Sequence, residues 1–442
     1  MIERIRNERL GECCEVYRHS SGLDILFVPK KCATMHASLI VRFGARDTKF
    51  IVNGEHMKCP DGVAHFLEHK MFARPDGSDA NDLFSALGAD ANAWTDYDKT
   101  AYLFNTSENA SESLRTLIKF VSEPYFTREN VARERGIIRE EIAMGEDDPW
   151  QKLYEQTMCA MYGRHAVRRK ICGTAASIKR ITDQTLWRCY NAFYRPSNMY
   201  LVVCGDMTMN EIIAAVDEPL NDWRVRAEGT PSVTRLFDPD RPKTVRSSVS
   251  KEGTVARPIF QIGWKNADLP IDPQQRLRHE TEMNILSEML FCRAGRFYHE
   301  LFEAGTLSPT YSYGYSTLGG QPGIAHHIVA GEADDPTLVW HAYRDYLNEM
   351  RRTGLDREDF ERLRRVLYAG FVAEFDFPDG IADLLCEAHG DGHGIFDALS
   401  ILQNVTFEDV CALFERSFDL KMTVFSTISP DHRNGENNKE EQ

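Results

Sequence analysis

The chain has 442 residues, 42% of them hydrophobic and 27% charged, which is the composition of a globular protein too long for one comfortable core. Its formal net charge of −15 argues against a nucleic-acid-binding protein, and its eleven cysteines, without a C-x-x-C pair, favour a reducing compartment. No run of about 18 apolar residues exists and the charged N-terminus lacks a signal-peptide core, so we expect a cytoplasmic protein with neither membrane nor nucleic-acid partners.

The elements predicted for the first half alternate between strands and helices. Residues 23–29 ("LDILFVP") and 37–44 ("ASLIVRFG") are rich in β-branched residues and end at Pro or Gly, which predicts strands. A helix is expected over "GVAHFLEHKMF", followed by strands at 91–95 and 100–105. Two further helices are expected over 107–124 and 127–150, the second capped by Thr127 with Asn130.

The chain also carries a weak internal duplication. "ITDQTLWRCYNAFYRPSNMYLVVCG" and "VTFEDVCALFERSFDLKMTVFSTIS" both place Thr before a helix that ends in aromatic residues, and an apolar strand follows. We therefore predict an α+β protein of two homologous domains, each a mostly antiparallel sheet with helices packed on one side, together forming one half of a clamshell. The domains are expected at 1–225 and 246–430, with a Pro- and Gly-containing linker at 226–245 and a disordered tail at 431–442.

The stretch "DGVAHFLEHKMF" carries His65-x-x-Glu68-His69. On a helix, positions i and i+4 share one face, so both imidazoles can bind one metal while Glu68 points at the same place. Hydrolytic zinc sites take three protein ligands and leave a position for water, and a neighbouring carboxylate can accept the proton of that water. Chance is the alternative, because the pattern arises in roughly a few per cent of proteins of this size and composition.

The helix over 127–150 offers a third ligand. Its spacing places Glu134 and Glu141 on the isoleucine stripe that should be buried, whereas Glu140 lies off that stripe. Buried carboxylates need partners, so we expect Glu141 to be a zinc ligand and Glu134 to orient an imidazole. The alternative is a partly exposed helix whose acids form ion pairs with neighbouring arginines.

Four segments, "PDGVAHFLEHKMF", "ANAWTDYDKTAYLF", "RERGIIREEIAMGEDDPW" and "YRPSNMYLVVCGD", resemble the pitrilysin/insulinase-type zinc peptidases, the inverzincins, in family order. This family includes the mitochondrial processing peptidase and short bacterial homologues. The resemblance implies that His65, His69 and Glu141 bind one Zn²⁺ per chain and that Glu68 is the general base. It also makes Glu134 the second acid of the catalytic set.

The resemblance further implies a substrate-binding strand. The segment Ala91, Asn92, Ala93, Trp94 and Thr95 resembles the sheet edge that receives the substrate as an added strand. For Trp94, simple core packing is an equally good interpretation.

The second half departs from the family pattern "LR-x-x-x-x-GL-x-Y". Phe302 stands where the substrate-holding arginine is expected, and Pro309 stands near the tyrosine position, with Tyr311, Tyr313 and Tyr315 close by. Without such donors a developing oxyanion loses part of its stabilisation. Short family members work as pairs of chains, so the departure implies a heterodimer in which a second family chain supplies the Arg/Tyr pair. A homodimer is the other arrangement.

These observations favour a zinc-dependent endopeptidase that cleaves peptides or small unfolded proteins inside a closed chamber, as the zinc-bearing subunit of a two-chain peptidase. The alternative is a non-catalytic peptide-binding or structural subunit that retains the metal site. Two other histidine pairs are weaker candidates. Glycines in "HGDGHG" (389–394) argue against a helix there, and the adjacent His326 and His327 should face opposite sides of a strand.

Overall fold

The computed structural model describes residues 1–226, 231–318 and 323–431. The chain forms two compact units: unit 1 is Met1–Ile142, Arg169–Phe237 and Val372–Phe396, and unit 2 is Ala143–Arg168, Asp238–Phe371 and Asp397–Gln442. Among the described residues, no helix combines the length and the apolarity needed to cross a membrane. Of the expected tail, only Asp431 lies within the described residues.

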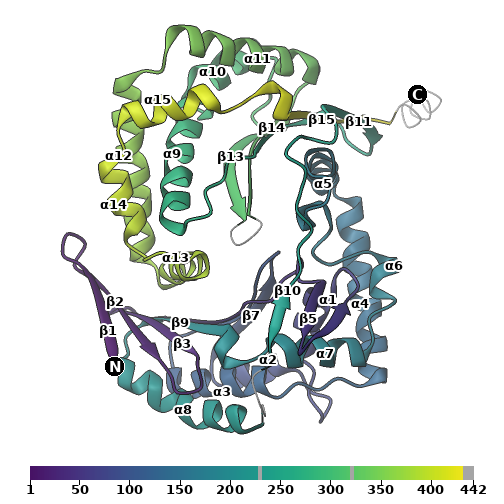
Figure 1. Cartoon of the computed structure of the whole chain (residues 1–442), viewed down its shortest axis with the longest axis vertical. Coiled ribbons are helices and arrows are strands. Elements are labelled where there is room, and N and C mark those ends of the chain that lie inside the picture. Colours follow the sequence, from purple (N-terminus) through teal and green to yellow (C-terminus); the bar gives the residue numbers. More distant parts are fainter. Residues whose placement is uncertain (227–230, 319–322, 432–442) are drawn as a thin grey trace, which may run out of the picture. The chain divides into compact units, whose positions relative to one another are not determined.

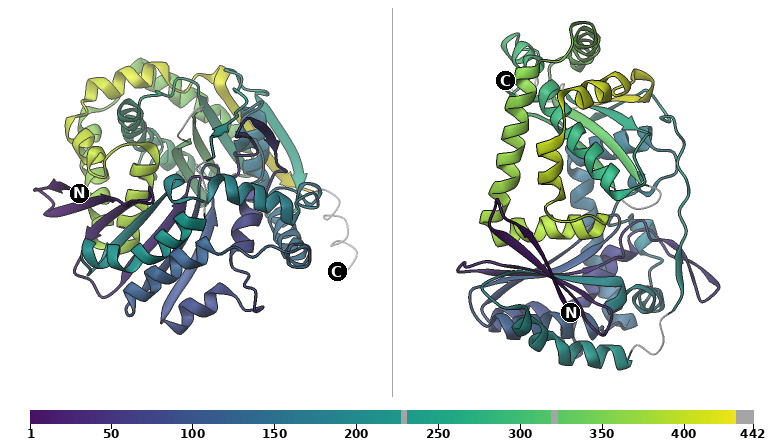
Figure 2. Two further views of the ribbon diagram at one scale, coloured as in Figure 1. Left: turned by 60° about the horizontal axis from the view of Figure 1, so that its bottom comes forward. Right: turned by 60° about the vertical axis from the view of Figure 1, so that its left-hand side comes forward.

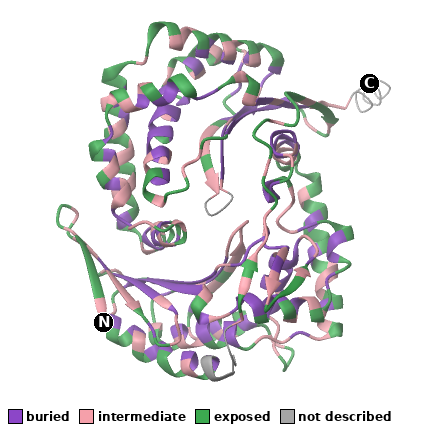
Figure 3. Ribbon diagram, in the orientation of Figure 1, coloured by how far each residue is buried: buried purple, intermediate pink, exposed green. Residues whose placement is uncertain are grey.

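Unit 1 is built on a mixed sheet with the strand order β1-β2-β3-β9-β4-β8-β7. Neighbouring strands are antiparallel except β3 and β9, which are parallel. The central strands β4 and β9 are buried along their whole length (Figure 3). The strands are β1 (Ile2–Asn7), β2 (Glu12–Arg18), β3 (Asp24–Pro29), β4 (Met35–Val41), β7 (Ala89–Thr95), β8 (Thr100–Thr106) and β9 (Met199–Gly205).

Helices cover one face of this sheet and enclose the main core (Figures 1 and 2). Helix α3 packs on β4, β8 and α8, and α1 packs on β7, β8 and α7. The helices of unit 1 are α1 (Val63–Met71), α2 (Ala80–Ala86), α3 (Ala110–Ser122), α4 (Arg128–Asp147, which runs into unit 2), α6 (Ala175–Ile178), α7 (Asp183–Phe193), α8 (Met209–Arg226) and α13 (Pro378–Asp391), with short turns η2 (Pro196–Asn198) and η3 (Glu374–Asp376).

A small sheet, β10-β5-β6, lies beside these elements in unit 1. Its strands are β5 (Lys49–Val52), β6 (Glu55–Lys58) and β10 (Val233–Arg235). Strand β10 lies in the expected linker, where it pairs antiparallel with β5. Residues 227–230 of that linker lie outside the described residues.

Unit 2 repeats the arrangement with the strand order β11-β15-β12-β14-β13. A second core lies between this sheet and helices that include α9 and α15. The strands are β11 (Ser248–Gly253), β12 (Ile259–Asn266), β13 (Tyr311–Leu318), β14 (Ile324–Glu332) and β15 (Thr423–Pro430). The helices are α5 (Pro149–Met161), α9 (Pro273–Phe291), α10 (Arg296–Glu303), α11 (Pro336–Thr353), α12 (Arg357–Ala373), α14 (Asp397–Asn404) and α15 (Phe407–Arg416), with turns η1 (Ala166–Arg168) and η4 (Leu420–Met422).

The two sheets confirm the internal duplication. In chain order, β3, β4, β7, β8 and β9 take the same places and directions in their sheet as β11, β12, β13, β14 and β15 take in theirs, with a parallel pair only at β3–β9 and β11–β15. The predicted caps are present too: Thr182 and Thr406 each begin a helix with a reciprocal capping box. Both helices lead through a short turn into the last strand of the repeat.

Each sheet also carries one helix on its second face, and the two halves of the chain exchange these helices. Tyr200 of β9 donates from its hydroxyl to the Cys386 carbonyl of α13, while its neighbour Leu201 points into the main core. Side chains alternate along a strand, so α13 covers the face opposite α3. In unit 2, Gly263 of β12 contacts α5, and its neighbour Ile262 lies in the second core. Each compact unit therefore combines residues from both halves of the sequence.

Candidate metal and catalytic site

Helix α1, most of whose residues are buried, carries His65, Glu68 and His69. Its N-cap residue, Gly62, has a φ of +88°. A Cβ at this position would lie 2.5 Å from the Cys172 carbonyl oxygen, so only glycine fits. The apolar side chains of α1 pack into the main core. The side chains of His65 and His69 are 12% and 25% exposed, and their ring centroids lie 4.6 Å apart. The predicted helix and the shared face of its two histidines are both present.

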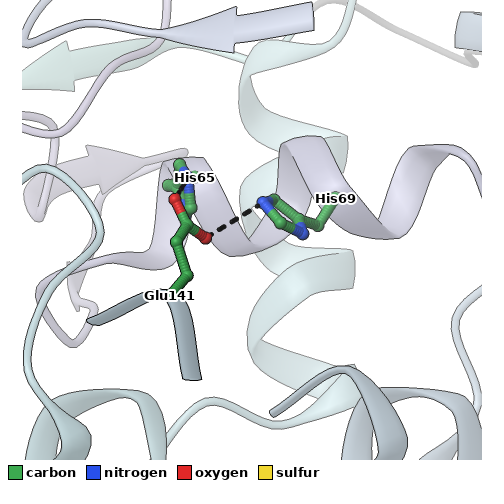
Figure 4. Close-up of side chains that lie close together, drawn as sticks. All are labelled: His65, His69 and Glu141. Carbon is green, nitrogen blue, oxygen red and sulfur yellow. Dashed lines mark ion pairs between the residues drawn. The ribbon is translucent and has the colours of Figure 1, made fainter. Parts of the chain in front are cut away.

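Glu141 of α4 faces both histidines (Figure 4). Its Oε1 lies 3.3 Å from His65 Nε2, and its Oε2 lies 3.5 Å from His69 Nε2. The hydrogen bond to His65 is the main cause that holds the pKa of Glu141 below its usual value. One possible ligand atom from each of His65, His69 and Glu141 lies within 4.8 Å of the other two.

These donors fit a zinc ion by their chemistry and their spacing. Zinc in proteins binds imidazole nitrogens and carboxylate oxygens at about 2.0–2.2 Å, so two donors of a tetrahedral site lie roughly 3.3 Å apart. The two distances from Glu141 oxygens to imidazole nitrogens, 3.3 and 3.5 Å, match that separation. The lowered pKa also keeps the Glu141 carboxylate ionised, and the ionised form is the one that binds a cation.

Glu134 contacts Nδ1 of His69, the ring nitrogen that does not face Glu141. Its Oε1 lies 3.2 Å from His69 Nδ1, and its Oε2 accepts a hydrogen bond of 3.2 Å from Lys70 Nζ. Burial lowers the pKa of His69, but the bond to Glu134 and the nearby carboxylates outweigh it, so the pKa is raised overall. A carboxylate on Nδ1 fixes the proton there and leaves Nε2 free to bind a metal. In contrast, His65 Nδ1 is buried and has no hydrogen-bond partner within the described part of the chain.

Glu68 is buried beside the histidines, with 7% of its surface exposed. Thr95, the last residue of β7, donates a hydrogen bond of 2.6 Å from its hydroxyl to Glu68 Oε2. Burial raises the pKa of Glu68, and the Thr95 bond and the two histidines offset this only partly. A general base with a raised pKa works closer to neutral pH.

The burial expected for Glu141 is wrong, although its place beside the histidines is not. Its side chain is 46% exposed, and Ile137 and Met144 on the same face of α4 are 53% and 73% exposed. The buried stripe of α4 consists of Val131, Ile138 and Ile142, so the helix touches the core along a narrower line than the isoleucine spacing predicts.

Two contacts at the site do not follow from the sequence pattern. Lys70 is buried, with 3% of its side chain exposed, and only its position inside an apolar helical run could have indicated this. Thr95 was expected only in the substrate-binding strand, yet its hydroxyl holds Glu68.

Strand β7 contains all five residues expected to bind substrate, from Ala91 to Thr95. It pairs with β8 and ends the sheet, so within the described residues its other edge has no neighbouring strand. Trp94 is half-buried on this strand and does not belong to the main core, so simple core packing does not describe it.

The three tyrosines near the expected donor position, Tyr311, Tyr313 and Tyr315, each form a hydrogen bond through their hydroxyl. Tyr311 donates to the Phe291 carbonyl, Tyr313 donates to Glu288, and Tyr315 accepts from Asn266. The guanidinium of Arg293 donates to the carbonyl oxygens of residues 309 and 311. Phe302 is 39% exposed on α10.

The remaining histidine candidates are separate from this site. The helix α13 runs through His389 and ends at Gly392, which has a φ of +84°, so the expectation that no helix forms there is wrong for its first residues. His326 bonds to Tyr162, and His327 bonds to Ser287. Burial lowers the pKa of both histidines, to about 4 and about 3. The two therefore have different partners, as expected for neighbours on a strand.

Comparison with known proteins identifies the family of the chain. The family model described as "Insulinase (Peptidase family M16)" matches residues 50–175, and that described as "Peptidase M16 inactive domain" matches residues 180–367. The uncharacterized zinc protease YmfH of Bacillus subtilis is 34% identical over 415 residues, covering 93% of this chain and 95% of YmfH. An uncharacterized zinc protease of Rickettsia felis is 27% identical over 161 residues, which cover 36% of this chain and 39% of that protein.

Solved structures give the same result. A protein from Alicyclobacillus acidocaldarius described as an M16-like peptidase has a TM-score of 0.88 and 30% identity, covering 95% of this chain and 99% of that one. Pitrilysin has a TM-score of 0.73 at 16% identity, with 97% of this chain aligned to 46% of the pitrilysin chain, which shows a shared fold. The chain belongs to the insulinase family of peptidases, family M16.

Proposed function

We propose that this chain is a zinc-dependent endopeptidase that cleaves peptides or small unfolded proteins. The observation that carries the proposal is the convergence of His65, His69 and Glu141 beside the buried Glu68. The names of its relatives, which call them zinc proteases, support the same activity and the same metal.

In this proposal, His65 Nε2, His69 Nε2 and the Glu141 carboxylate hold one Zn²⁺ per chain. The ion, when bound, supplies Lewis-acid polarisation of a carbonyl and of a water molecule. Glu134 keeps the proton of His69 on Nδ1, so that Nε2 faces the metal.

Glu68 is the general base. Its carboxylate accepts a proton from the attacking water and returns it to the leaving amine. The Thr95 hydroxyl holds one carboxylate oxygen, which fixes the orientation of the other. Because Thr95 ends β7, the base is tied directly to the strand on which the substrate would lie.

We propose that the substrate adds to the free edge of β7 as an antiparallel or parallel strand. Backbone hydrogen bonds then supply most of the affinity, which suits a peptidase that recognises extended backbone. The exposed Ile137 and Met144 flank Glu141 on α4 and offer apolar contacts to substrate side chains.

The second half supports a two-chain enzyme. Phe302 and Pro309 supply no side-chain donor, the hydroxyls of Tyr311 and Tyr313 already donate within unit 2, and that of Tyr315 is held as the acceptor of Asn266. We propose that a second family chain supplies an arginine and a tyrosine to stabilise the oxyanion, in a closed chamber formed by both chains. A non-catalytic peptide-binding subunit is the second candidate, and the same missing donors favour it.

Hydrolysis of a mixed peptide library, with zinc content measured in parallel, tests the proposal. Glu68→Gln should abolish cleavage and keep zinc, whereas Glu141→Gln should lose zinc. The exposed Glu140 lies next to Glu141 in the sequence, so Glu140→Gln is the matched control and should keep both. Because a partner supplies donors, the chain is assayed alone and after mixing with a second family chain from the same source. Zinc-loaded protein without Glu68-dependent cleavage in either sample would favour the binding subunit.

A further inference from the structure

A pocket of about 340 Å³ lies in unit 2, between α5 and the edge strand β11. Both elements are labelled in Figure 1. Helix α5 contributes Lys152, Gln156 and Cys159, and β11 contributes Lys251. The volume lies in the range of pockets that hold small organic ligands.

The lining of this pocket is strongly basic, although the chain as a whole carries a net charge of −15. Four cations, Lys152, Arg168, Arg246 and Lys251, line the pocket, against one carboxylate, Glu155. The carboxamide of Gln151 donates to Glu155, and Arg168 donates to the Gly163 carbonyl. Within the described residues, none of the four cations forms an ion pair with a carboxylate. All four are exposed, so water and salt screen much of their repulsion, and a bound anion with several charges relieves the rest.

Gln156 forms part of the pocket wall. It is 6% exposed, and its side-chain nitrogen donates 3.0 Å to the Thr427 carbonyl. Its Oε1 is buried and accepts no hydrogen bond from the described part of the chain. This oxygen is already shielded from the pocket, so a ligand there does not reach it, and recognition depends on the four cations.

We infer that this pocket binds a small organic phosphate. A phosphate ester bears the multiple negative charge that four cations against one carboxylate match, and guanidinium groups bind phosphate oxygens in pairs. The site is distinct from the proposed zinc site, whose side chains all belong to unit 1.

Calorimetric titration of the full chain with adenosine monophosphate, inorganic pyrophosphate and citrate tests the inference. Saturable binding of adenosine monophosphate is expected, and it should weaken as salt is added. The double variant Arg246→Glu/Lys251→Glu should weaken it roughly tenfold or more. Arg352→Glu/Arg365→Glu changes the net charge equally on exposed positions of unit 2 and should leave binding unchanged. Binding absent for both phosphates, tighter for citrate, or weakened equally by the control would overturn the inference.

Cys159 reports on the same pocket without any substitution. Its thiol lines the cavity and donates to the Arg168 carbonyl at 3.3 Å. Adenosine monophosphate should slow alkylation of Cys159 by N-ethylmaleimide, followed by peptide mass spectrometry. Cys411 is also partly exposed in unit 2 and should be unaffected. Unchanged alkylation of Cys159 under saturating ligand would place the binding elsewhere and refute the assignment.

Discussion

Replacing Thr95 with valine should shift the pH dependence of catalysis, because this substitution removes one hydroxyl and keeps the side-chain shape. The Thr95 hydroxyl donates 2.6 Å to Glu68 Oε2. A hydrogen bond to a charged group contributes about 1.5–3 kcal/mol, which corresponds to roughly 10–100-fold in the balance between ionised and protonated carboxyl. Burial already raises the pKa of Glu68, and the Thr95 bond opposes that rise. Without it the pKa rises further, so a higher pH is needed to ionise the base.

The assay is the pH profile of kcat/KM, measured with the chain in its active assembly. The acid limb of Thr95→Val should move to higher pH, with about tenfold less activity on that limb and a smaller loss on the high-pH plateau. Thr95→Ser keeps the hydroxyl and should retain the wild-type limb. An acid limb that stays in place, or moves to lower pH, would refute the account of Glu68.

The hydrogen bond between Thr95 and Glu68 also affects the free energy of unfolding, which can be measured without an activity assay. The folded-state pKa of Glu68 is raised, so this group favours folding when protonated, and that contribution is lost as pH rises through its folded pKa. Thr95→Val removes a bond that favours the ionised form. The loss of unfolding free energy relative to wild type should therefore be larger at high pH than at low pH, as measured by urea denaturation of zinc-free protein.

Three further predictions concern the surroundings of the site. Lys70→Met should lower the free energy of unfolding by about 3 kcal/mol in urea denaturation, because it removes the ammonium partner of the partly buried Glu134 and leaves that carboxylate only His69; a loss below 1 kcal/mol would contradict the buried ion pair. Zinc affinity, measured by competition with a chelator, should fall steeply on mild acidification, because the raised pKa of His69 lets protons compete at higher pH than for an ordinary histidine. An affinity that stays flat there would contradict the assignment of His69. The purified chain alone should cleave poorly and gain activity with a second family chain, as followed by size-exclusion chromatography and peptide hydrolysis; a fully active homodimer would refute the partner role argued from Phe302 and Pro309.

Local signals predicted the elements of the site well. The spacing of His65 and His69 on an apolar run predicts α1 and the face that they share, and both are present. The expected strands at 91–95 and 100–105 lie within β7 and β8. Thr127 and Asn130 cap α4 reciprocally, as the sequence indicates. Each of these features depends on residues close together in the chain.

Features that depend on tertiary packing were not predictable in the same way. The hydroxyl of Thr95 meets Glu68 across 27 positions, and Lys70 meets Glu134 across 64. Helical spacing gives the direction of Glu141 but not how closely neighbouring elements cover it, which explains its unexpected exposure. The exchange of α5 and α13 likewise depends on which sheet face is left open, and apolar strands such as β4 do not indicate the helix that covers them.

The exposed face of α4 has a consequence for how long the proposed zinc ion stays bound. Glu141 and its neighbours Ile137 and Met144 are all exposed to water. Of the three proposed ligands, Glu141 is therefore the one that solvent and competing chelators reach most easily. A peptide packed over those two side chains would expel that water and strengthen the attraction between carboxylate and cation. Zinc should then dissociate faster from the substrate-free protein than from the substrate-bound protein. Metal exchange should therefore take place mainly in the substrate-free protein.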